Sequence, residues 1–137
     1  MMQIATCSSK VWICTLYYAI DNKFNIYFIS EPATRHCKDI SLNKNIACAI
    51  TETNQKVIDK KHGVQLSGLA SIVKGGAELK SAIKAWNKSN PGMEKWINFK
   101  TISTNKIRGK FYKIKPNFIK FFNEELYGSE GFKNFKI

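Results

Sequence analysis

The residues best suited to bind a ligand stand together in "EPATRHCKDISLNKN", residues 31–45. Thr34 precedes a short helix predicted from about Arg35 to Leu42, and its hydroxyl is suited to cap the first turn. A helix N-terminus already carries a partial positive charge, so Arg35 and His36 are unfavourable there without a partner. A bound anion explains the pattern, with Thr34 and first-turn amides donating hydrogen bonds and Arg35 contacting phosphate oxygens.

A second interpretation of this segment needs no ligand, because Arg35 is equally able to pair with Glu31 or Asp39 while His36 is solvated. Downstream, the strand-like "GVQLSG" places one amide, Gln65, among apolar residues. A buried amide needs hydrogen-bonding partners, which a ligand or a neighbouring loop would supply. Gly68 in the same stretch indicates a bulge or a close approach of backbone or ligand.

The size and composition of the chain predict one globular domain over residues 1–137, since 44% of its residues are hydrophobic and 23% are charged. No apolar run approaches the ~20 residues of a membrane span, and "MMQIATCSSK" lacks the features of a signal peptide. The four cysteines form no CxxC pair, so we expect free thiols and no metal site. We therefore expect a soluble cytoplasmic protein without a membrane partner.

The net charge of +12 raises the question of nucleic-acid binding. Residues 1–70 hold eight Lys/Arg against five Asp/Glu, and residues 71–137 hold fourteen against five, with the lysines spread singly. The best support for binding is "KIRGKFYKIK", although a strand with one solvated face explains its alternation equally well. We do not expect nucleic acid to be the partner.

Five apolar stretches of strand length occupy the first half of the chain. They read "QIATCSS", "VWICTLYYAI", "FNIYFIS", "NIACAITE" and "VQLSGLASIV", and Asp21-Asn22-Lys23 joins the second and third as a hairpin. "KIRGKFYKI" predicts a sixth strand. In "GGAELKSAIKAWNKS" apolar residues recur at helical spacing, and residues 93–105 fit a short helix and then a strand. Pro116 is predicted to open a further helix, "PNFIKFFNEEL", which Gly128 ends.

At least six strands and a few short helices indicate a mainly β, antiparallel fold whose sheet must either close or expose an edge. A small barrel satisfies this requirement. Because a sheet that stays open exposes apolar faces and edges that a twofold partner can cover, we expect a homodimer.

Several short pieces, in order and at compatible spacing, resemble the pyridoxamine 5'-phosphate oxidase-like FMN-binding split-barrel family, in particular its small uncharacterised bacterial branch. The pieces are Ile4-Ala5-Thr6-Cys7-Ser8, Trp12, Thr15, Tyr17-Tyr18, Ile26-Tyr27-Phe28-Ile29-Ser30, Thr34-Arg35-His36, Asn45 to Ala49, and Gly63-Val64-Gln65-Leu66-Ser67-Gly68. The resemblance covers residues 4 to about 75 and, more loosely, "GKFYKIKPNFIKFF". It implies a six-stranded antiparallel split β-barrel of Greek-key type that dimerises and binds FMN between the protomers.

By position, the resemblance implies that Thr34, Arg35 and His36 contact the FMN phosphate and that Gln65 reaches the flavin ring. Five further residues would line the cofactor, namely Trp12, Thr15, Phe28, Ile29 and Ser30. The aromatic residues among them need no such role if they belong to the core. The implied function is that of an FMN-dependent oxidoreductase of unknown substrate, and no residue stands out as a catalytic base or nucleophile.

The sequence departs from the vitamin oxidases of this family at two charged positions. An ungapped match places Cys14 and Ala19 where those enzymes have an arginine for the FMN phosphate and a lysine for the substrate. We therefore do not expect pyridoxamine 5'-phosphate oxidase activity, and we expect weaker FMN binding. Two other functions remain open: a non-catalytic module for haem, a deazaflavin or another phosphate-bearing ligand, and a basic nucleic-acid-binding barrel with aromatics and lysines on one sheet face.

Overall fold

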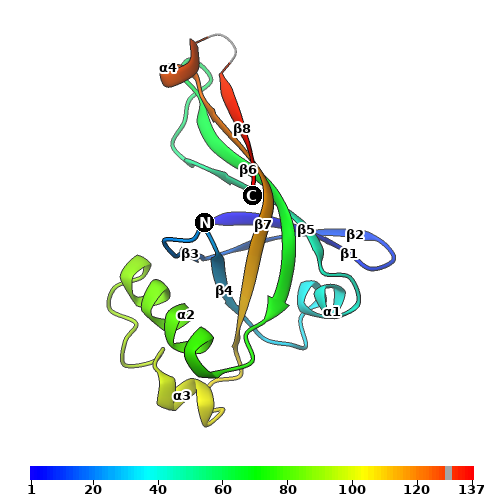
Figure 1. Ribbon diagram of the computed structural model, residues 1–137, viewed down its shortest axis with the longest axis vertical. Coiled ribbons are helices and arrows are strands. Elements are labelled where there is room, and N and C mark those ends of the chain that lie inside the picture. The colour runs from blue at the N-terminus through cyan, green and yellow to red at the C-terminus, as the bar shows by residue number, and fades with distance from the viewer. Residues whose placement is uncertain (129–130) are drawn as a thin grey trace.

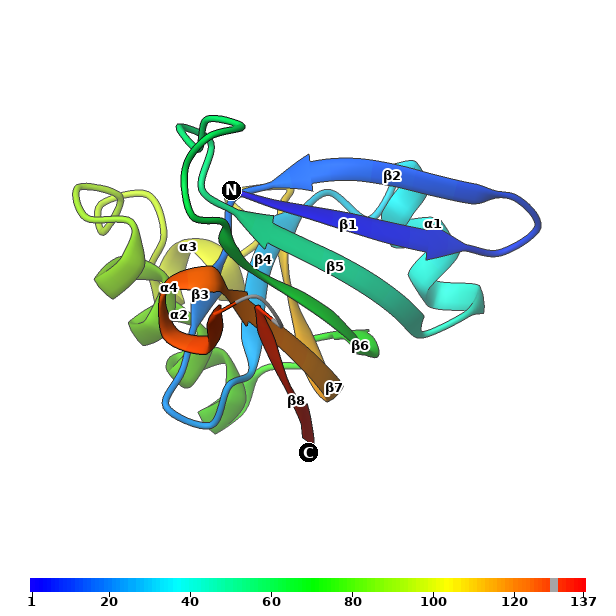
Figure 2. The same ribbon diagram turned by 90° about the horizontal axis from the view of Figure 1, so that it is seen from above.

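A computed structural model describes the chain from residue 1 to 137 except residues 129 and 130. Its described residues form an eight-stranded antiparallel sheet in the order β2-β1-β5-β6-β7-β4-β3, with β8 paired to β7. The sheet curls into half of a barrel (Figures 1 and 2). The strands are β1 (Met2–Cys7), β2 (Val11–Leu16), β3 (Ala19–Ile20), β4 (Ile26–Ser30), β5 (Asn45–Thr51), β6 (His62–Ile72), β7 (Lys110–Asn123) and β8 (Phe132–Lys136).

Helices cover two separate parts of this sheet (Figure 1). They are α1 (Arg35–Leu42), α2 (Gly76–Ser89), α3 (Phe99–Ser103) and α4 (Glu124–Tyr127). α1 packs against β1 and β2, whereas α2 packs against β3, β4 and α3. None of the helices in the described part of the chain is long and apolar enough to cross a membrane.

Two apolar clusters form the core because alternate residues of a strand face opposite sides of the sheet. Phe28 of β4 and Ile114 of β7 belong to the cluster inside the curl, where both are fully buried. Tyr27 and Phe111 belong to the second cluster, which lies between the sheet and α2 and includes Trp86. β4 and β7 are thus covered on both faces.

The predicted strands and the helices after Thr34 and Gly75 are confirmed, with one difference early in the chain. The stretch "VWICTLYYAI" forms two strands, β2 and β3, separated at Tyr17 and Tyr18. In the region 93–105 the short helix is confirmed as α3, but no strand follows before Lys110.

The helix predicted from Pro116 is wrong, because the chain from Lys110 to Asn123 is one long strand. Its register against β6 shifts between Ser67 and Gly68, so that Pro116 lies at a bulge. A proline is compatible with a strand there, since the ladder is already interrupted. Only the segment Glu124–Tyr127, at the end of the predicted helix, is helical, as α4, which ends before Gly128 as predicted.

The far ends of β6 and β7 leave the body of the molecule and continue into α4 and β8, as Figure 1 shows. We call residues 62–67 and 118–123, together with α4 and β8, the arm. β8 was not predicted, and each of its five residues is exposed. Gly68 lies where the arm joins the body: a Cβ atom on it would be 2.5 Å from the Lys115 carbonyl oxygen, so the predicted close approach of backbone is confirmed.

Candidate functional site

The N-terminus of α1 gathers four of the side chains singled out by the sequence. Ser30 ends β4, and a short turn brings Thr34 back beside it. The Ser30 hydroxyl lies 2.7 Å from His36 Nε2 and 3.3 Å from the Thr34 hydroxyl, which is itself 3.3 Å from His36 Nε2. We call Ser30, Thr34, Arg35 and His36 the α1 cradle.

The predicted capping hydrogen bond of Thr34 is not formed. The Thr34 hydroxyl instead donates to the carbonyl oxygen of Glu31 at 2.8 Å, and the Thr34 backbone N–H donates to the same oxygen at 3.0 Å. The hydroxyl therefore closes this turn and caps no backbone amide of α1. The first turn of α1 consequently lacks a side-chain cap and contains no acidic residue, so its amides can still donate to an anion.

Arg35 lies over the indole of Trp12, with its guanidinium carbon 4.4 Å from the ring centroid. The described residues include no carboxylate in ion-pair contact with Arg35, so the alternative interpretation of this residue is not supported. Asp39 is engaged elsewhere, because its carboxylate accepts hydrogen bonds from Thr6 at 3.0 Å and from Ser8 at 2.6 Å. Arg35 thus makes no ion pair among the described residues, although its charge is near enough to lower the pKa of Asp39.

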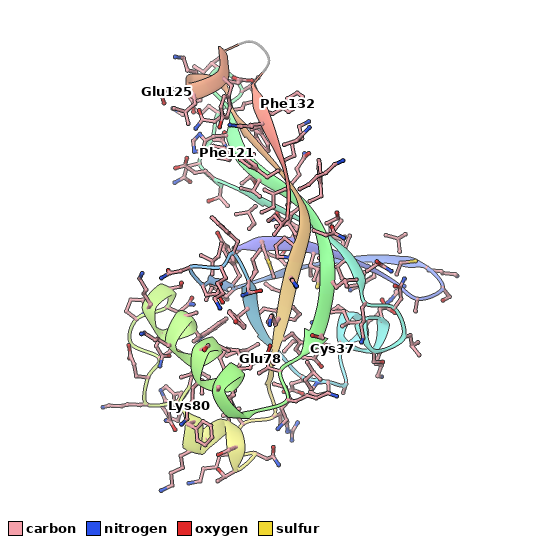
Figure 3. All side chains as sticks on the ribbon, in the orientation of Figure 1. Cys37, Glu78, Lys80, Phe121, Glu125 and Phe132 are labelled. Carbon is pink, nitrogen blue, oxygen red and sulfur yellow. The ribbon has the colours of Figure 1, made fainter. Side chains whose placement is uncertain are left out.

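Cys37 lies directly behind the cradle, where α1 meets the sheet (Figure 3), and only 2% of its surface is exposed. Burial raises the pKa of this thiol, but hydrogen bonds from His36, Thr34, Tyr112 and Ser30 outweigh burial and lower the pKa to about 7. The polar groups of the cradle thus already stabilise a negative charge. The sequence predicted only a free thiol at Cys37, although its place in the first turn of a helix was a signal for a lowered pKa.

Two of the predicted lining residues belong to the core of the single chain. Phe28 is 0% exposed and stacks on Tyr112 with the ring centroids 5.1 Å apart. Ile29 faces the other way and packs against the cluster under α2. The Phe28 ring lies behind the cradle, with its centroid 6.3 Å from that of the His36 ring. The role of Phe28 and Ile29 as cofactor lining stays a prediction.

Thr15 and Gln65 lie on the outer face of the sheet, away from the cradle. The register places Thr15, Gln3, Ala49 and Gln65 in one row across β2, β1, β5 and β6, so about 14 Å separates the two predicted residues. The expected burial of Gln65 is wrong, because this side chain is exposed. It lines a shallow hollow of about 410 Å³ together with small and apolar side chains such as Ala47.

The remaining titratable groups add no metal centre. Among the described residues no cluster of three or more His, Cys, Asp or Glu side chains could hold a metal ion, and all four cysteines are free. His62, on the arm, is exposed, and its Nε2 lies 2.7 Å from a carboxylate oxygen of Glu52.

Comparisons with known proteins agree with this architecture. No family model and no curated protein matches the sequence. Among solved structures, a haem-binding protein from Mycobacterium smegmatis aligns with a TM-score of 0.75 at 13% identity over 98% of this chain and 52% of the other, so this chain spans about half its length. General stress protein 26 from Bacillus anthracis aligns with a TM-score of 0.66 at 17% identity over 99% and 88% of the two chains.

A third structure, a candidate pyridoxamine 5'-phosphate oxidase from Listeria innocua, aligns with a TM-score of 0.65 at 12% identity over 88% and 86% of the two chains. These TM-scores establish the fold, whereas identities this low leave the ligand open. The predicted fold class is confirmed, with eight strands in a half-barrel in place of six. The chain has the split-barrel fold of the pyridoxamine 5'-phosphate oxidase-like proteins.

Proposed function

We propose that this protein binds FMN as a homodimer, with the FMN phosphate in the α1 cradle, and that it is an oxidoreductase of unknown substrate. The observation that carries the proposal is the position of Arg35, which lies at an uncapped helix N-terminus without a carboxylate in ion-pair contact among the described residues.

The cradle fits a phosphate group better than the single chain fits a flavin ring. Hydroxyl, imidazole and guanidinium groups converge on the start of α1, which is the donor set that phosphate oxygens require. Of the residues that the resemblance places around the ring, Phe28 and Ile29 belong to the core, and Thr15 and Gln65 lie on the outer face. A second copy of the chain is therefore needed to complete the ring site.

The outer face of the sheet is suited to receive that second copy. Val11, Ile13 and Leu69 are 73%, 62% and 48% exposed on it, and the small residues Ala47 and Ala49 lie between them. An exposed apolar sheet face of this kind is typical of a protein contact. Dimerisation through it would also bring Gln65 into the interface.

The flavin supplies hydride or electron transfer when it is bound, and the protein supplies position and polarity. In this arrangement Arg35 holds the phosphate, and Trp12 holds Arg35 by a cation–π contact. Ser30 fixes the ring orientation of His36 through their 2.7 Å contact. No side chain in the cradle is assigned a catalytic step.

Titration with FMN and with riboflavin, which lacks the phosphate, tests the proposal. Arg35→Ala should raise the dissociation constant for FMN by roughly tenfold to a hundredfold, because it removes a charged hydrogen-bond partner, and should leave riboflavin binding unchanged. Lys38→Ala is the matched control, since Lys38 is an exposed cation one turn further along α1. Equal effects of the two substitutions would contradict a phosphate site at Arg35.

Haem is the second candidate ligand, because one of the aligned structures is a haem-binding protein. His62 provides an exposed imidazole for such a ligand, and it lies on the arm, away from the cradle. The absorbance spectrum of the purified protein separates the two candidates. Flavin bands support the proposal, whereas a Soret band that His62→Ala removes would replace it.

A further inference from the structure

A polar hollow lies on the α2 side of the sheet, between that helix and the turn that joins β3 to β4. It has a volume of about 630 Å³, within the range of roughly 300–1,000 Å³ that is usual for small-molecule sites. Every residue of its lining except Ile20 and Ala85 carries a polar or charged side chain. We call this hollow the basin; the turn, β4, β7 and α2 all contribute to its wall.

The basin is separate from the α1 cradle. Tyr27, near the start of β4, lines the basin, whereas Ser30, at the end of the same strand, belongs to the cradle. Because these two residues are three positions apart in one strand, their side chains point to opposite faces of the sheet. A ligand in the basin would therefore leave the cradle free.

Three lysines bring positive charge to the basin from two different elements. Lys23 comes from the turn, and Lys84 and Lys88 come from α2. All three are exposed, and none of them forms an ion pair among the described residues. Lys84 and Lys88 lie one turn apart on the helix, and like charges at this spacing destabilise a helix. An anion between the lysines would replace this repulsion by attraction.

The two carboxylates of the basin are engaged with other groups. Glu78 accepts a hydrogen bond from Lys113 Nζ at 2.6 Å, in a partly buried ion pair. The Asp21 carboxylate accepts hydrogen bonds from the backbone N–H groups of Lys23 and Asn25 at 2.8 and 2.9 Å, and from the Tyr27 hydroxyl at 3.0 Å. With four lysines and two carboxylates in its lining, the basin has an excess of positive charge, which favours an anionic ligand.

The turn that carries Lys23 is held in a strained conformation. The φ angle of Phe24 is 61°, in the left-handed region, which a bulky side chain rarely adopts. The Phe24 ring is 58% exposed, so packing against the core does not compensate for the strain. The Phe24 N–H donates to the Asp21 carbonyl oxygen at 3.1 Å, which adds to the hydrogen bonds of the Asp21 carboxylate. Strain that is over-determined in this way is concentrated at ligand sites.

The basin also offers acceptors that suit hydroxyl groups. The ion pair with Lys113 uses one carboxylate oxygen of Glu78 and leaves the second able to accept. Ser81 lies one turn after Glu78 on the same side of α2, and both line the basin. The Tyr27 hydroxyl donates to Asp21, and its oxygen can still accept. A ligand with only negative charge would be repelled by Glu78, whereas a ligand hydroxyl can donate to it.

We propose that the basin binds a phosphorylated sugar, a small molecule with several hydroxyls and one phosphate group. The phosphate would lie among Lys23, Lys84 and Lys88, since lysines bind phosphate as point charges. The hydroxyls would bond to Glu78, Ser81 and Tyr27. This ligand class meets both the excess positive charge of the basin and its hydrogen-bond acceptors.

Isothermal titration calorimetry on the intact protein tests the proposal with three probes: glucose 6-phosphate, glucose and inorganic phosphate. We expect glucose 6-phosphate to bind more tightly than the other two, because it alone meets both the lysines and the acceptors. Inorganic phosphate that binds as tightly as glucose 6-phosphate would show a site for any anion and would overturn the proposal. Failure of glucose 6-phosphate to bind would overturn it as well.

The double variant Lys84→Gln, Lys88→Gln tests the lysines of α2. It should raise the dissociation constant for glucose 6-phosphate at least tenfold, because it removes two charged partners of the phosphate. Lys80→Gln is the control on the same helix, since Lys80 Nζ lies over the Phe99 ring of α3, outside the basin. Figure 3 shows Glu78 and Lys80 on different sides of α2. Equal effects of the lysine variants would overturn the proposal.

Ser81→Ala tests the recognition of hydroxyls without a loss of folding, because alanine is the better helix former. It should weaken glucose 6-phosphate binding by roughly threefold to tenfold, the range for one neutral hydrogen bond. Binding of inorganic phosphate should not change. Equal losses for the two probes would overturn the role of Ser81 in binding the sugar.

The cradle is the competing site for the phosphate of this probe, and it makes a different prediction. Arg35→Ala should leave glucose 6-phosphate binding unchanged if the ligand lies in the basin. A loss with Arg35→Ala and none with the double lysine variant would place the ligand in the cradle and overturn the proposal. FMN binding should respond to Arg35→Ala alone, so failure of the FMN proposal and failure of this one are distinguishable.

Discussion

The cradle and the basin lie at opposite ends of β4, and their loops are held in different ways. The cradle depends on contacts between distant parts of the chain, because Asp39 of α1 accepts hydrogen bonds from Thr6 and Ser8 at the end of β1. The turn of the basin is fixed locally, by Asp21 within five residues. The comparison teaches that one rigid sheet supports two sites whose loops are positioned independently.

The largest expected effect comes from the core around β4, the strand that both regions share. Phe28→Ala should lower the free energy of unfolding by about 3–5 kcal/mol, because this ring is 0% exposed and stacks on Tyr112. Phe24→Ala is the comparison within the same hairpin, since its ring is 58% exposed. Urea unfolding measures the free energy of unfolding of both variants. A small loss for Phe28→Ala would show that the two ends of β4 do not depend on a common core.

Gly68→Ala should destabilise the protein by about 1–3 kcal/mol and should leave the cradle and the basin nearly unchanged. The new Cβ would lie 2.5 Å from the Lys115 carbonyl oxygen and 2.9 Å from the Cα of Pro116, both backbone atoms that cannot rotate away. Urea unfolding measures the loss. Gly68 and Pro116 belong to neither site, so the folded variant should bind FMN and glucose 6-phosphate like the parent. Ser67→Ala is the control, because the Ser67 hydroxyl bonds only to the exposed Asn117.

Most of the strands and helices were predictable because their sequence signals are local. Alternating apolar residues in "QIATCSS" and "NIACAITE" produced β1 and β5, and the helical spacing in "GGAELKSAIKAWNKS" produced α2. The helix expected from Pro116 failed because its apolar spacing also fits a strand with aromatic residues on both faces. The deciding contact, a bulge opposite Gly68, is nonlocal.

The sequence predicted which residues form the candidate site better than it predicted the contacts between them. Thr34, Arg35 and His36 come together because they are adjacent in sequence. The partner of Arg35 is Trp12, from a strand more than twenty residues away, and no pattern in the sequence indicates that contact. Gln65 was expected to be buried because its strand is apolar, but its side chain points to the face of the sheet that the single chain leaves uncovered.

Acid unfolding tests the Asp39 carboxylate, which joins α1 to the end of β1. The hydrogen bond from Ser8, then that from Thr6 and the charge on Arg35, lower the pKa of Asp39 against the opposing effect of burial. A carboxyl whose pKa is lowered in the folded state stabilises the protein at pH values above its pKa in the unfolded chain, about 3.9. This contribution is lost as the pH falls through the folded pKa.

Asp39→Asn should therefore be less stable than the parent at neutral pH, and the difference should shrink as the pH falls below about 4. Urea unfolding at a series of pH values measures this difference. Asp59→Asn, in an exposed loop, is the control. A constant difference between the parent and Asp39→Asn across this range would show that the carboxylate charge does not hold α1 to β1.

Arg35→Ala should have the smallest effect on the free energy of unfolding, although it should strongly weaken FMN binding. A cation–π contact at an exposed site contributes about 0.5–1 kcal/mol, and Arg35 makes no ion pair among the described residues. Arg35→Ala and Trp12→Leu should each lower the free energy of unfolding by about that much. The double variant should lower it by less than the sum of the two, because the two residues share one interaction.

Trp12→Leu should also weaken FMN binding without changing riboflavin binding, because a guanidinium released from the indole must be reordered by the phosphate. The double-mutant cycle is measured by urea unfolding and the ligand cycle by titration. Additive losses in both cycles would show that the indole does not hold the guanidinium. Coupling in the ligand cycle alone would mean that Trp12 acts on Arg35 only when the anion is bound, and the cradle would then be completed by its ligand.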